Sequence, residues 1–203
     1  MNTPHLIHSV KGVLVAIVCG LAITSCADLA RTGTGPAFLI IQSVTGARGG
    51  TTAGTFASNL ESDVITNSSV FSDVGQASIR AEMKNALSTT TPSPINSITL
   101  NRYRVEYRRT DGQNQPGIDV PFPIEGATTV NIQVGTGSAQ VVGFDLVRLQ
   151  AKLERPLRNL VGGGGLIVIS TIAEVTFYGA DQAGNAVSIT GSIDVKFADF
   201  GDS

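Results

Sequence analysis

Residues 167–197 read IVISTIAEVTFYGADQAGNAVSITGSIDVKF, and this stretch decides the fold class. Apolar and polar side chains alternate on both sides of a central polar segment. Before that segment the odd positions carry Ile167, Ile169, Thr171, Ala173, Val175 and Phe177, and after it they carry Val187, Ile189, Ile193, Val195 and Phe197. A period of two places these side chains on one face of a strand. The stretch therefore predicts a long antiparallel hairpin with its turn at residues 181–185.

The same alternation recurs earlier in the chain. Strand-like runs occupy residues 38–44, 77–84, 98–107, 129–134 and 144–149. Two of these runs change the parity of their apolar positions, near Asn101 and near Leu146, which predicts a β-bulge or a strand break at each point. Residues 149–160 favour a short helix that Pro156 interrupts. The four glycines at residues 162–165 predict a flexible turn.

Together these runs predict seven or eight strands separated by segments rich in Gly, Pro, Asn and Asp. No apolar pattern with a period of 3.6 residues persists beyond a turn or two. The chain has 203 residues, of which 42% are apolar and 23 are Gly, and this length and composition fit one globular domain. We therefore predict an all-β fold, an antiparallel β-sandwich, as a single domain over residues 37–203.

The turn sequence DQAGN at residues 181–185 resembles a hairpin turn that is frequent in the last strands of bacterial immunoglobulin-like and fibronectin-like extracellular domains. Asp181 can close such a turn with its side chain, and Gly184 and Asn185 tolerate positive φ. The resemblance implies an immunoglobulin-like sandwich. The chain has no Trp and lacks the paired cysteines of antibody domains, so the resemblance implies an architecture and no activity.

The amino-terminal segment contains the three parts of a secretory signal. Lys11 precedes an apolar run at residues 13–23, and the small residues Thr24 and Ser25 follow it. As a helix this run rises only about 16 Å, whereas the hydrocarbon core of a bilayer is roughly 30 Å thick. The segment therefore predicts a cleaved signal peptide over residues 1–25, with an uncleaved membrane anchor as the weaker alternative.

The tetrad ITSC at residues 23–26 resembles the lipobox of bacterial lipoproteins, with Ile in place of the commoner Leu. In that family the cysteine is acylated before cleavage, so the resemblance implies a lipid on Cys26 and a tether over residues 26–36. More than one acyl chain is needed for firm anchoring, and a triacylated cysteine supplies them. Ala27, where inner-membrane lipoproteins typically carry Asp, favours the outer membrane. The expected location is the bacterial cell envelope; an ordinary signal peptide with a chance cysteine is the alternative.

Cleavage before Cys26 would restrict the chemistry of the mature chain. His5, His8 and Cys19 all lie in the predicted signal, so no histidine and no free thiol would remain. This excludes Ser-His-Asp and Cys-His catalysis and zinc sites built from His or Cys. The net charge of −2, from 14 Lys+Arg against 16 Asp+Glu, argues against a nucleic-acid partner. We expect no cofactor and no enzymatic activity, and we favour a binding or structural module for another envelope protein or a polysaccharide.

Two alternatives use the side chains that would remain. One is a carbohydrate- or calcium-binding sandwich, for which the loop-placed oxygen donors are Asp111, Asp119, Asp181 and Asn185. The other is a glycan hydrolase that uses two carboxylates, for which the candidates are Asp63, Asp73, Asp119, Glu125 and Asp145. No spacing among these residues selects a pair, and Asp and Asn are also ordinary turn residues. Both alternatives therefore rank below the binding module, and we expect no metal site.

Arginines gather in one predicted strand. Arg102, Arg104 and Arg108 share a strand face with Glu106, and Arg109 follows. One interpretation is a patch for an anionic partner, such as lipid headgroups or a polysaccharide. The other is a solvated face on which the arginines pair with Glu106 and with carboxylates of neighbouring strands. We favour the paired face.

Overall fold

The computed structural model describes residues 35–50, 54–85, 92–135 and 137–201. The chain from Gly35 onward forms one compact unit. The predicted signal peptide at residues 1–25 and Cys26 lie outside the described residues, as does most of the predicted tether.

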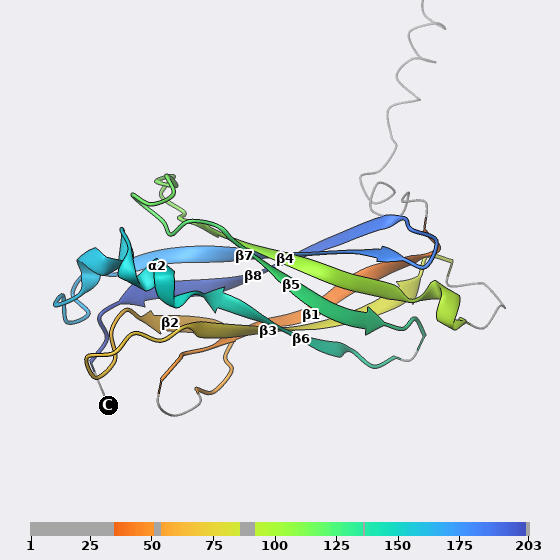
Figure 1. The fold of residues 1–203 in the computed structure, drawn as a ribbon, viewed down its shortest axis with the longest axis horizontal. Coiled ribbons are helices and arrows are strands. Elements are labelled where there is room, and N and C mark those ends of the chain that lie inside the picture. The colour runs from red at the N-terminus through yellow and green to blue at the C-terminus, as the bar shows by residue number, and fades with distance from the viewer. Residues whose placement is uncertain (1–34, 51–53, 86–91, 136, 202–203) are drawn as a thin grey trace, which may run out of the picture. The chain divides into compact units, whose positions relative to one another are not determined.

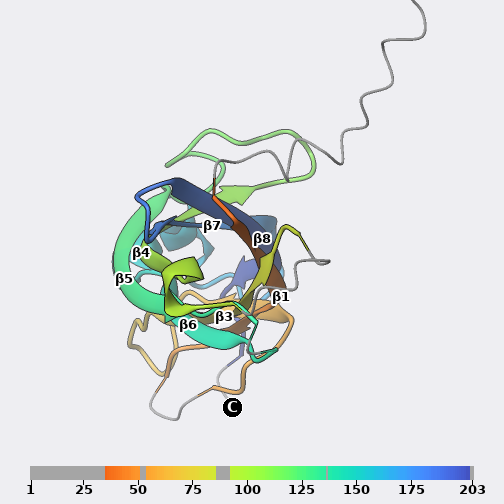
Figure 2. The same ribbon diagram turned by 90° about the vertical axis from the view of Figure 1, so that its right-hand side faces the viewer.

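Eight strands form two sheets that pack face to face (Figures 1 and 2). The first sheet has the order β1-β3-β6, with β1 at Ala37–Ala47, β3 at Asp73–Met83 and β6 at Gln140–Val147. The second has the order β2-β8-β7-β4-β5, with β2 at Asn59–Asp63, β8 at Ala186–Ala198, β7 at Ile169–Asp181, β4 at Ile98–Arg108 and β5 at Ile124–Ile132. Within the sheets the strands are antiparallel except for β2, which runs parallel to β8. The predicted all-β sandwich is confirmed.

The helical segments are short. They are η1 (Pro94–Asn96), α2 (Leu149–Leu153) and η2 (Leu157–Leu160). The predicted interruption at Pro156 is confirmed, because α2 ends before it and η2 starts after it. Among the described residues, no helix has the length and apolar character needed to span a bilayer.

The predicted C-terminal hairpin is formed by β7 and β8, but β7 begins two residues later than its alternating pattern. Ile169 pairs with Phe197, and β8 ends one residue further on, at Ala198. Residues 167–168 therefore have no partner strand, and Ile167 is 58% exposed rather than buried. Further along β7, Ala173, Val175 and Phe177 are fully buried as predicted.

Both predicted irregularities are β-bulges. In β4, Leu100 pairs with Gly179 and Arg102 pairs with Tyr178, so Asn101 is the extra residue. In β6, the partners of Asp73 and Val74 are Val147 and Asp145, so Leu146 is the extra residue. Each bulge lets apolar residues of opposite parity enter the same core.

The core lies between the two sheets, and aromatic rings from both sheets pack against one another in it. The ring of Phe144 lies 5.7 Å from that of Tyr103 and 5.5 Å from that of Phe177, measured between centroids. The hydroxyl of buried Tyr107 donates to the carbonyl of Leu146 at 2.5 Å, and burial raises the pKa of this phenol. The described core residues all lie between Ala37 and Phe197. Residues 27–203 therefore contain all of the described core.

Asp181 closes the turn between β7 and β8 as predicted. Its Oδ1 accepts hydrogen bonds from the backbone N–H groups of Ala183 (3.0 Å) and Asn185 (2.8 Å), and its Oδ2 accepts one from the side-chain amide of Asn185 (2.8 Å). Gly184 has φ of 84°, whereas Asn185 is not in the left-handed region. The Asn185 amide, followed by the backbone donors, lowers the pKa of Asp181 below its ordinary value of 3.8.

This turn predicts an acid-dependent loss of stability. A carboxylate with a lowered folded-state pKa stabilises the fold above its unfolded pKa and loses that contribution as the pH falls through the folded value. We expect the difference in melting temperature between wild type and Asp181→Asn to be constant above about pH 5 and to shrink below pH 3.8. Thermal melts across this range measure it, with Asp194→Asn on the exposed face of β8 as the control. A difference that is the same at acidic and neutral pH would contradict the prediction.

Candidate functional site

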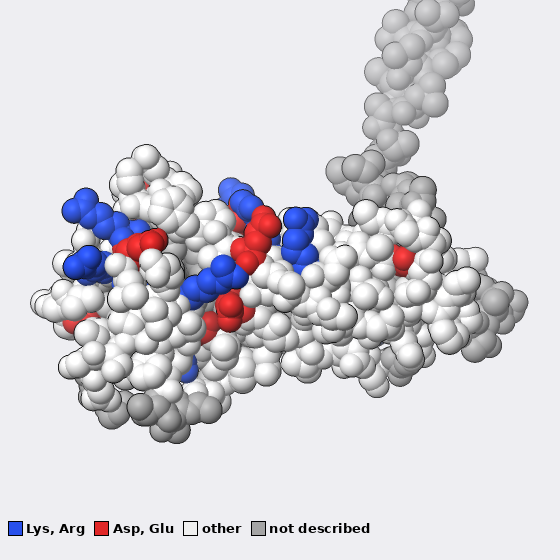
Figure 3. Space-filling model, in the orientation of Figure 1, with Lys and Arg blue, Asp and Glu red and all other residues white. Residues whose placement is uncertain are grey.

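The structure places Arg102, Arg104 and Arg108 on the solvent face of β4 and Arg109 directly after this strand. Each of the four arginines meets a carboxylate. Arg104 binds Glu125 of β5 at 2.8 Å, and it also binds Glu106 on its own strand. Arg108 binds Glu174 of β7 at 2.8 Å. Figure 3 shows basic and acidic side chains interleaved across the middle of this face.

The other two arginines are also engaged. Arg102 lies 3.7 Å from Glu125, and its guanidinium stacks over the ring of Tyr178 at 4.4 Å from the centroid. Arg109 pairs with Asp111. Pairing raises the pKa of Arg104 and of Arg109 and lowers that of Glu106 and of Asp111.

The charges on this face balance. The cations are Arg102, Arg104, Arg108 and Arg109, and the carboxylates are Glu106, Glu125, Glu174 and Asp111, so four positive charges meet four negative ones. This geometry fits the paired-face interpretation. A role for the arginines in binding an anionic partner stays a prediction.

The oxygen donors considered for calcium are not brought together. Asp111 and Asp119 lie in the loop between β4 and β5, whereas Asp181 and Asn185 lie at the opposite ends of these strands, because Ile98 at the start of β4 pairs with Asp181. Asp119 accepts the N–H of Gln115 at 3.0 Å. Within the described ranges, no three His, Cys, Asp or Glu side chains are grouped as metal ligands.

The carboxylates considered for hydrolysis are engaged in separate contacts. Asp63 binds the Thr66 hydroxyl and the N–H of Phe200, Glu125 binds arginines, and Asp145 lies 3.6 Å from Arg148. Asp63 and Asp73 are 2% and 0% exposed, so a glycan in solution does not reach them. The geometry selects no catalytic pair.

Asp73 forms a buried ion pair that the sequence did not indicate. The ammonium of Lys152 in α2 lies 2.9 Å from both carboxylate oxygens of Asp73, at the start of β3. Asp73 also accepts the Ser62 hydroxyl (2.6 Å) and the N–H of Gly49 (2.8 Å). Burial lowers the pKa of Lys152, and the charge of Asp73 opposes this shift. The pair fixes α2 against β2 and β3.

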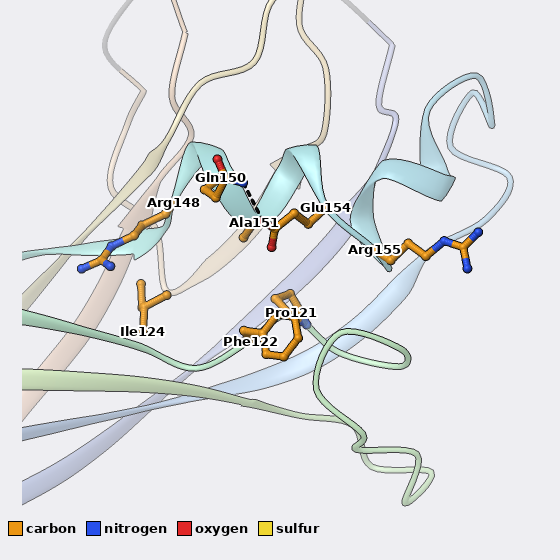
Figure 4. Close-up of a pocket in the computed structure, with 8 residues that line it drawn as sticks. All are labelled: Pro121, Phe122, Ile124, Arg148, Gln150, Ala151, Glu154 and Arg155. Atoms are coloured by element: carbon orange, nitrogen blue, oxygen red, sulfur yellow. Dashed lines mark hydrogen bonds between the residues drawn. The ribbon is translucent and has the colours of Figure 1, made fainter.

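The fixed helix forms one wall of a small apolar cavity of about 140 Å³ (Figure 4). Pro121, Phe122 and Ile124 form the other wall. Phe122 and Pro121 face Ala151 across the cavity, while the charged ends of Arg148 and Arg155 point away from it (Figure 4). A void of this size holds about one apolar side chain or one benzene-sized ring.

Exposed apolar side chains gather at the same end of the sandwich. We call this the α2 end; it comprises the loop at residues 109–123, α2, η2 and the loop at residues 161–168 (Figure 1). Eight of the twelve large apolar side chains exposed among the described residues lie there, namely Ile118, Phe122, Leu149, Leu153, Val161, Leu166, Ile167 and Val168. Exposed apolar surface of this kind is typical of interaction sites, so the α2 end is a candidate for one.

Sequence reasoning missed the α2 end because the alternation from Ile167 onward favoured a buried strand. The available signal was the apolar triplet Leu166–Val168 directly after four glycines, a poor place to start a strand. No protein family and no curated protein matches this chain. We therefore infer function from the sequence signal and the geometry of this domain.

Proposed function

We propose that this protein is a lipid-anchored, non-catalytic binding module of the bacterial cell envelope that presents its α2 end to another envelope component. The anchor is the acylated Cys26 implied by the lipobox resemblance, and the outer membrane is the favoured location. The observation that carries the proposal is the concentration of exposed apolar side chains at the α2 end.

The described domain begins at the end of the sandwich opposite to the α2 end. A Cβ added to Gly35 would lie 2.6 Å from the carboxylate of Asp181, in the β7–β8 turn. Strand β7 has 13 residues and runs from the α2 end to this turn, a length of about 40 Å. The α2 end is therefore the part of the domain furthest from where a tether from Cys26 would enter.

The cavity beside α2 supports a binding role more than a catalytic one. Its walls are mainly apolar, and the carboxylate of Glu154 at its rim accepts a hydrogen bond from Gln150 at 2.6 Å. Protein interfaces concentrate their affinity in a few anchoring side chains that fill such pockets. Phe122, which is 55% exposed, and the cavity behind it fit this pattern.

Cross-linking in cells followed by mass spectrometry tests the proposal. Wild type is expected to incorporate labelled palmitate, to fractionate with membranes and to capture a discrete envelope partner. Cys26→Ala is expected to lose the label and the partner. Phe122→Asp is expected to keep the label and the membrane location but lose the partner, because a charge cannot enter an apolar contact without a large desolvation cost.

Ile95→Asp is the matched control, because Ile95 is 70% exposed and lies in η1 at the other end of the domain. It is expected to behave as wild type. Palmitate on Cys26→Ala would contradict the anchor. Capture of the same partner by Phe122→Asp and wild type would contradict the role of the α2 end.

A further inference from the structure

The loop at residues 161–168 holds apolar side chains outside the domain. Gly162, Gly164 and Gly165 have φ between 55° and 82°, a region that other residues rarely adopt. The N–H of Gly162 donates to the carboxylate of Asp199 at 2.6 Å, and the N–H of Leu166 donates to the carbonyl of Gly163 at 3.0 Å. These hydrogen bonds give the loop a defined turn conformation.

The side chains at the tip of this turn are exposed to an unusual degree. Leu166 is 92% exposed, and Val161, Ile167 and Val168 are between 44% and 58% exposed. Directly before the loop, Leu157 and Leu160 of η2 are buried in the core. The loop therefore projects apolar groups from a rigid base.

Two arginines beside the loop form no ion pair with any described residue. Arg155 and Arg158 are exposed and lie just before and within η2, and the N–H of Val161 donates to the carbonyl of Arg158. Seven other cations have a carboxylate within 4.0 Å, namely Arg80, Arg102, Arg104, Arg108, Arg109, Arg148 and Lys152. Arg48 also lacks an ion pair with a described residue, but it donates to the carbonyl of Glu61 and lies over the ring of Phe200, and Lys196 lacks one on β8. The nearby acids Glu154 and Asp199 accept hydrogen bonds from Gln150 and from the N–H of Gly162.

We infer that the loop at residues 161–168 inserts Leu166 and Ile167 into the interfacial region of a phospholipid bilayer, while Arg155 and Arg158 bind lipid phosphates. Projecting aliphatic side chains flanked by basic residues suit the boundary between acyl chains and headgroups. Guanidinium groups form paired hydrogen bonds with phosphate oxygens. Leu166 is 92% exposed and makes little contact with its own domain, so its side chain is available for insertion.

This inference rests on the proposed function only in using the α2 end as the contact surface, and it does not require acylation of Cys26. The two positive charges of Arg155 and Arg158 are offset by Glu154 and Asp199, so apolar insertion supplies most of the affinity. The arginines add a preference for anionic lipid. Removing two inserted aliphatic side chains is expected to weaken binding by roughly tenfold or more.

Vesicle flotation tests the inference with residues 27–203, which contain all of the described core and no cysteine. Vesicles of phosphatidylethanolamine with phosphatidylglycerol are compared with vesicles of phosphatidylcholine alone. Wild type is expected to float with both and more strongly with the first. The double variant Leu166→Ser with Ile167→Ser is expected to lose flotation at an unchanged melting temperature, while Ile95→Ser floats as wild type.

The double variant Arg155→Gln with Arg158→Gln tests the phosphate contacts. It is expected to bind the two kinds of vesicle equally. The inference is overturned if wild type floats with neither vesicle or if the loop variant floats as well as wild type. Wild type that does not float but captures a protein partner in cells through Phe122 would support the proposed function. The same result would contradict the contact with lipid.

Discussion

Replacing Lys152 with Met is expected to lower the free energy of unfolding by about 3–5 kcal/mol, the usual cost of removing one partner from a buried ion pair. The carboxylate of Asp73 is fully buried, and its two oxygens each lie 2.9 Å from the ammonium of Lys152. In the variant, Asp73 keeps the donors of Ser62 and Gly49 but loses its only countercharge within 4.0 Å among the described residues. Urea unfolding followed by circular dichroism measures the change.

The double variant Lys152→Met with Asp73→Asn tests whether this loss comes from the unpaired charge of Asp73. Replacing both partners of a buried pair is often close to neutral, because no uncompensated charge remains. We expect the double variant to be more stable than Lys152→Met alone. A double variant that is less stable than Lys152→Met would contradict the electrostatic explanation, because the hydrogen bonds of the Asp73 carboxylate to Ser62 and Gly49 would then outweigh the cost of its unpaired charge.

Gly179→Ala is expected to destabilise the domain by about 1–3 kcal/mol or more, as overpacking in a filled interior does. An added Cβ would lie 2.1 Å from the carbonyl oxygen of Thr99 and 2.9 Å from the Cα of Leu100. Both are backbone atoms of β4 next to the bulge at Asn101, so no side-chain rotation relieves the contact. Chemical unfolding measures the loss.

Gly143→Ala is the matched control for this substitution. Gly143 also lies in a strand, but an added Cβ meets no atom within 4 Å. Removing backbone freedom from the unfolded chain is expected to leave this variant at least as stable as wild type. Equal losses for Gly179→Ala and Gly143→Ala would contradict the steric explanation.

Much of the sandwich was predictable because its decisive signals are local. The alternation in β7 and β8 and the parity changes at Asn101 and Leu146 follow from the period of a strand. Asp181 was recognisable as a turn residue because its hydrogen bonds reach only four residues along the chain.

The candidate site was less predictable because its contacts are distant in sequence. Asp73 and Lys152 are 79 residues apart, and a lysine in a short surface helix normally faces water. Ile167 continues the alternating pattern, but it would be buried only if β8 extended far enough to pair with it. The pattern of residues 167–177 does not show where β8 ends. Arg102, Arg104 and Arg108 do share one face of β4, but the pairing of Arg108 with Glu174 became visible only in the register of β4 and β7.

The position of β8 also determines when the domain can fold. This strand is the last of the eight to be synthesised, yet it lies between β2 and β7 and contributes Val195 and Phe197 to the core. The second sheet therefore remains incomplete until Ala198 has left the ribosome, and pairing between segments as far apart as β2 and β8 is intrinsically slow. For a chain that we propose to be exported, we expect this delay to keep the polypeptide unfolded during synthesis and to favour folding after it has crossed the membrane.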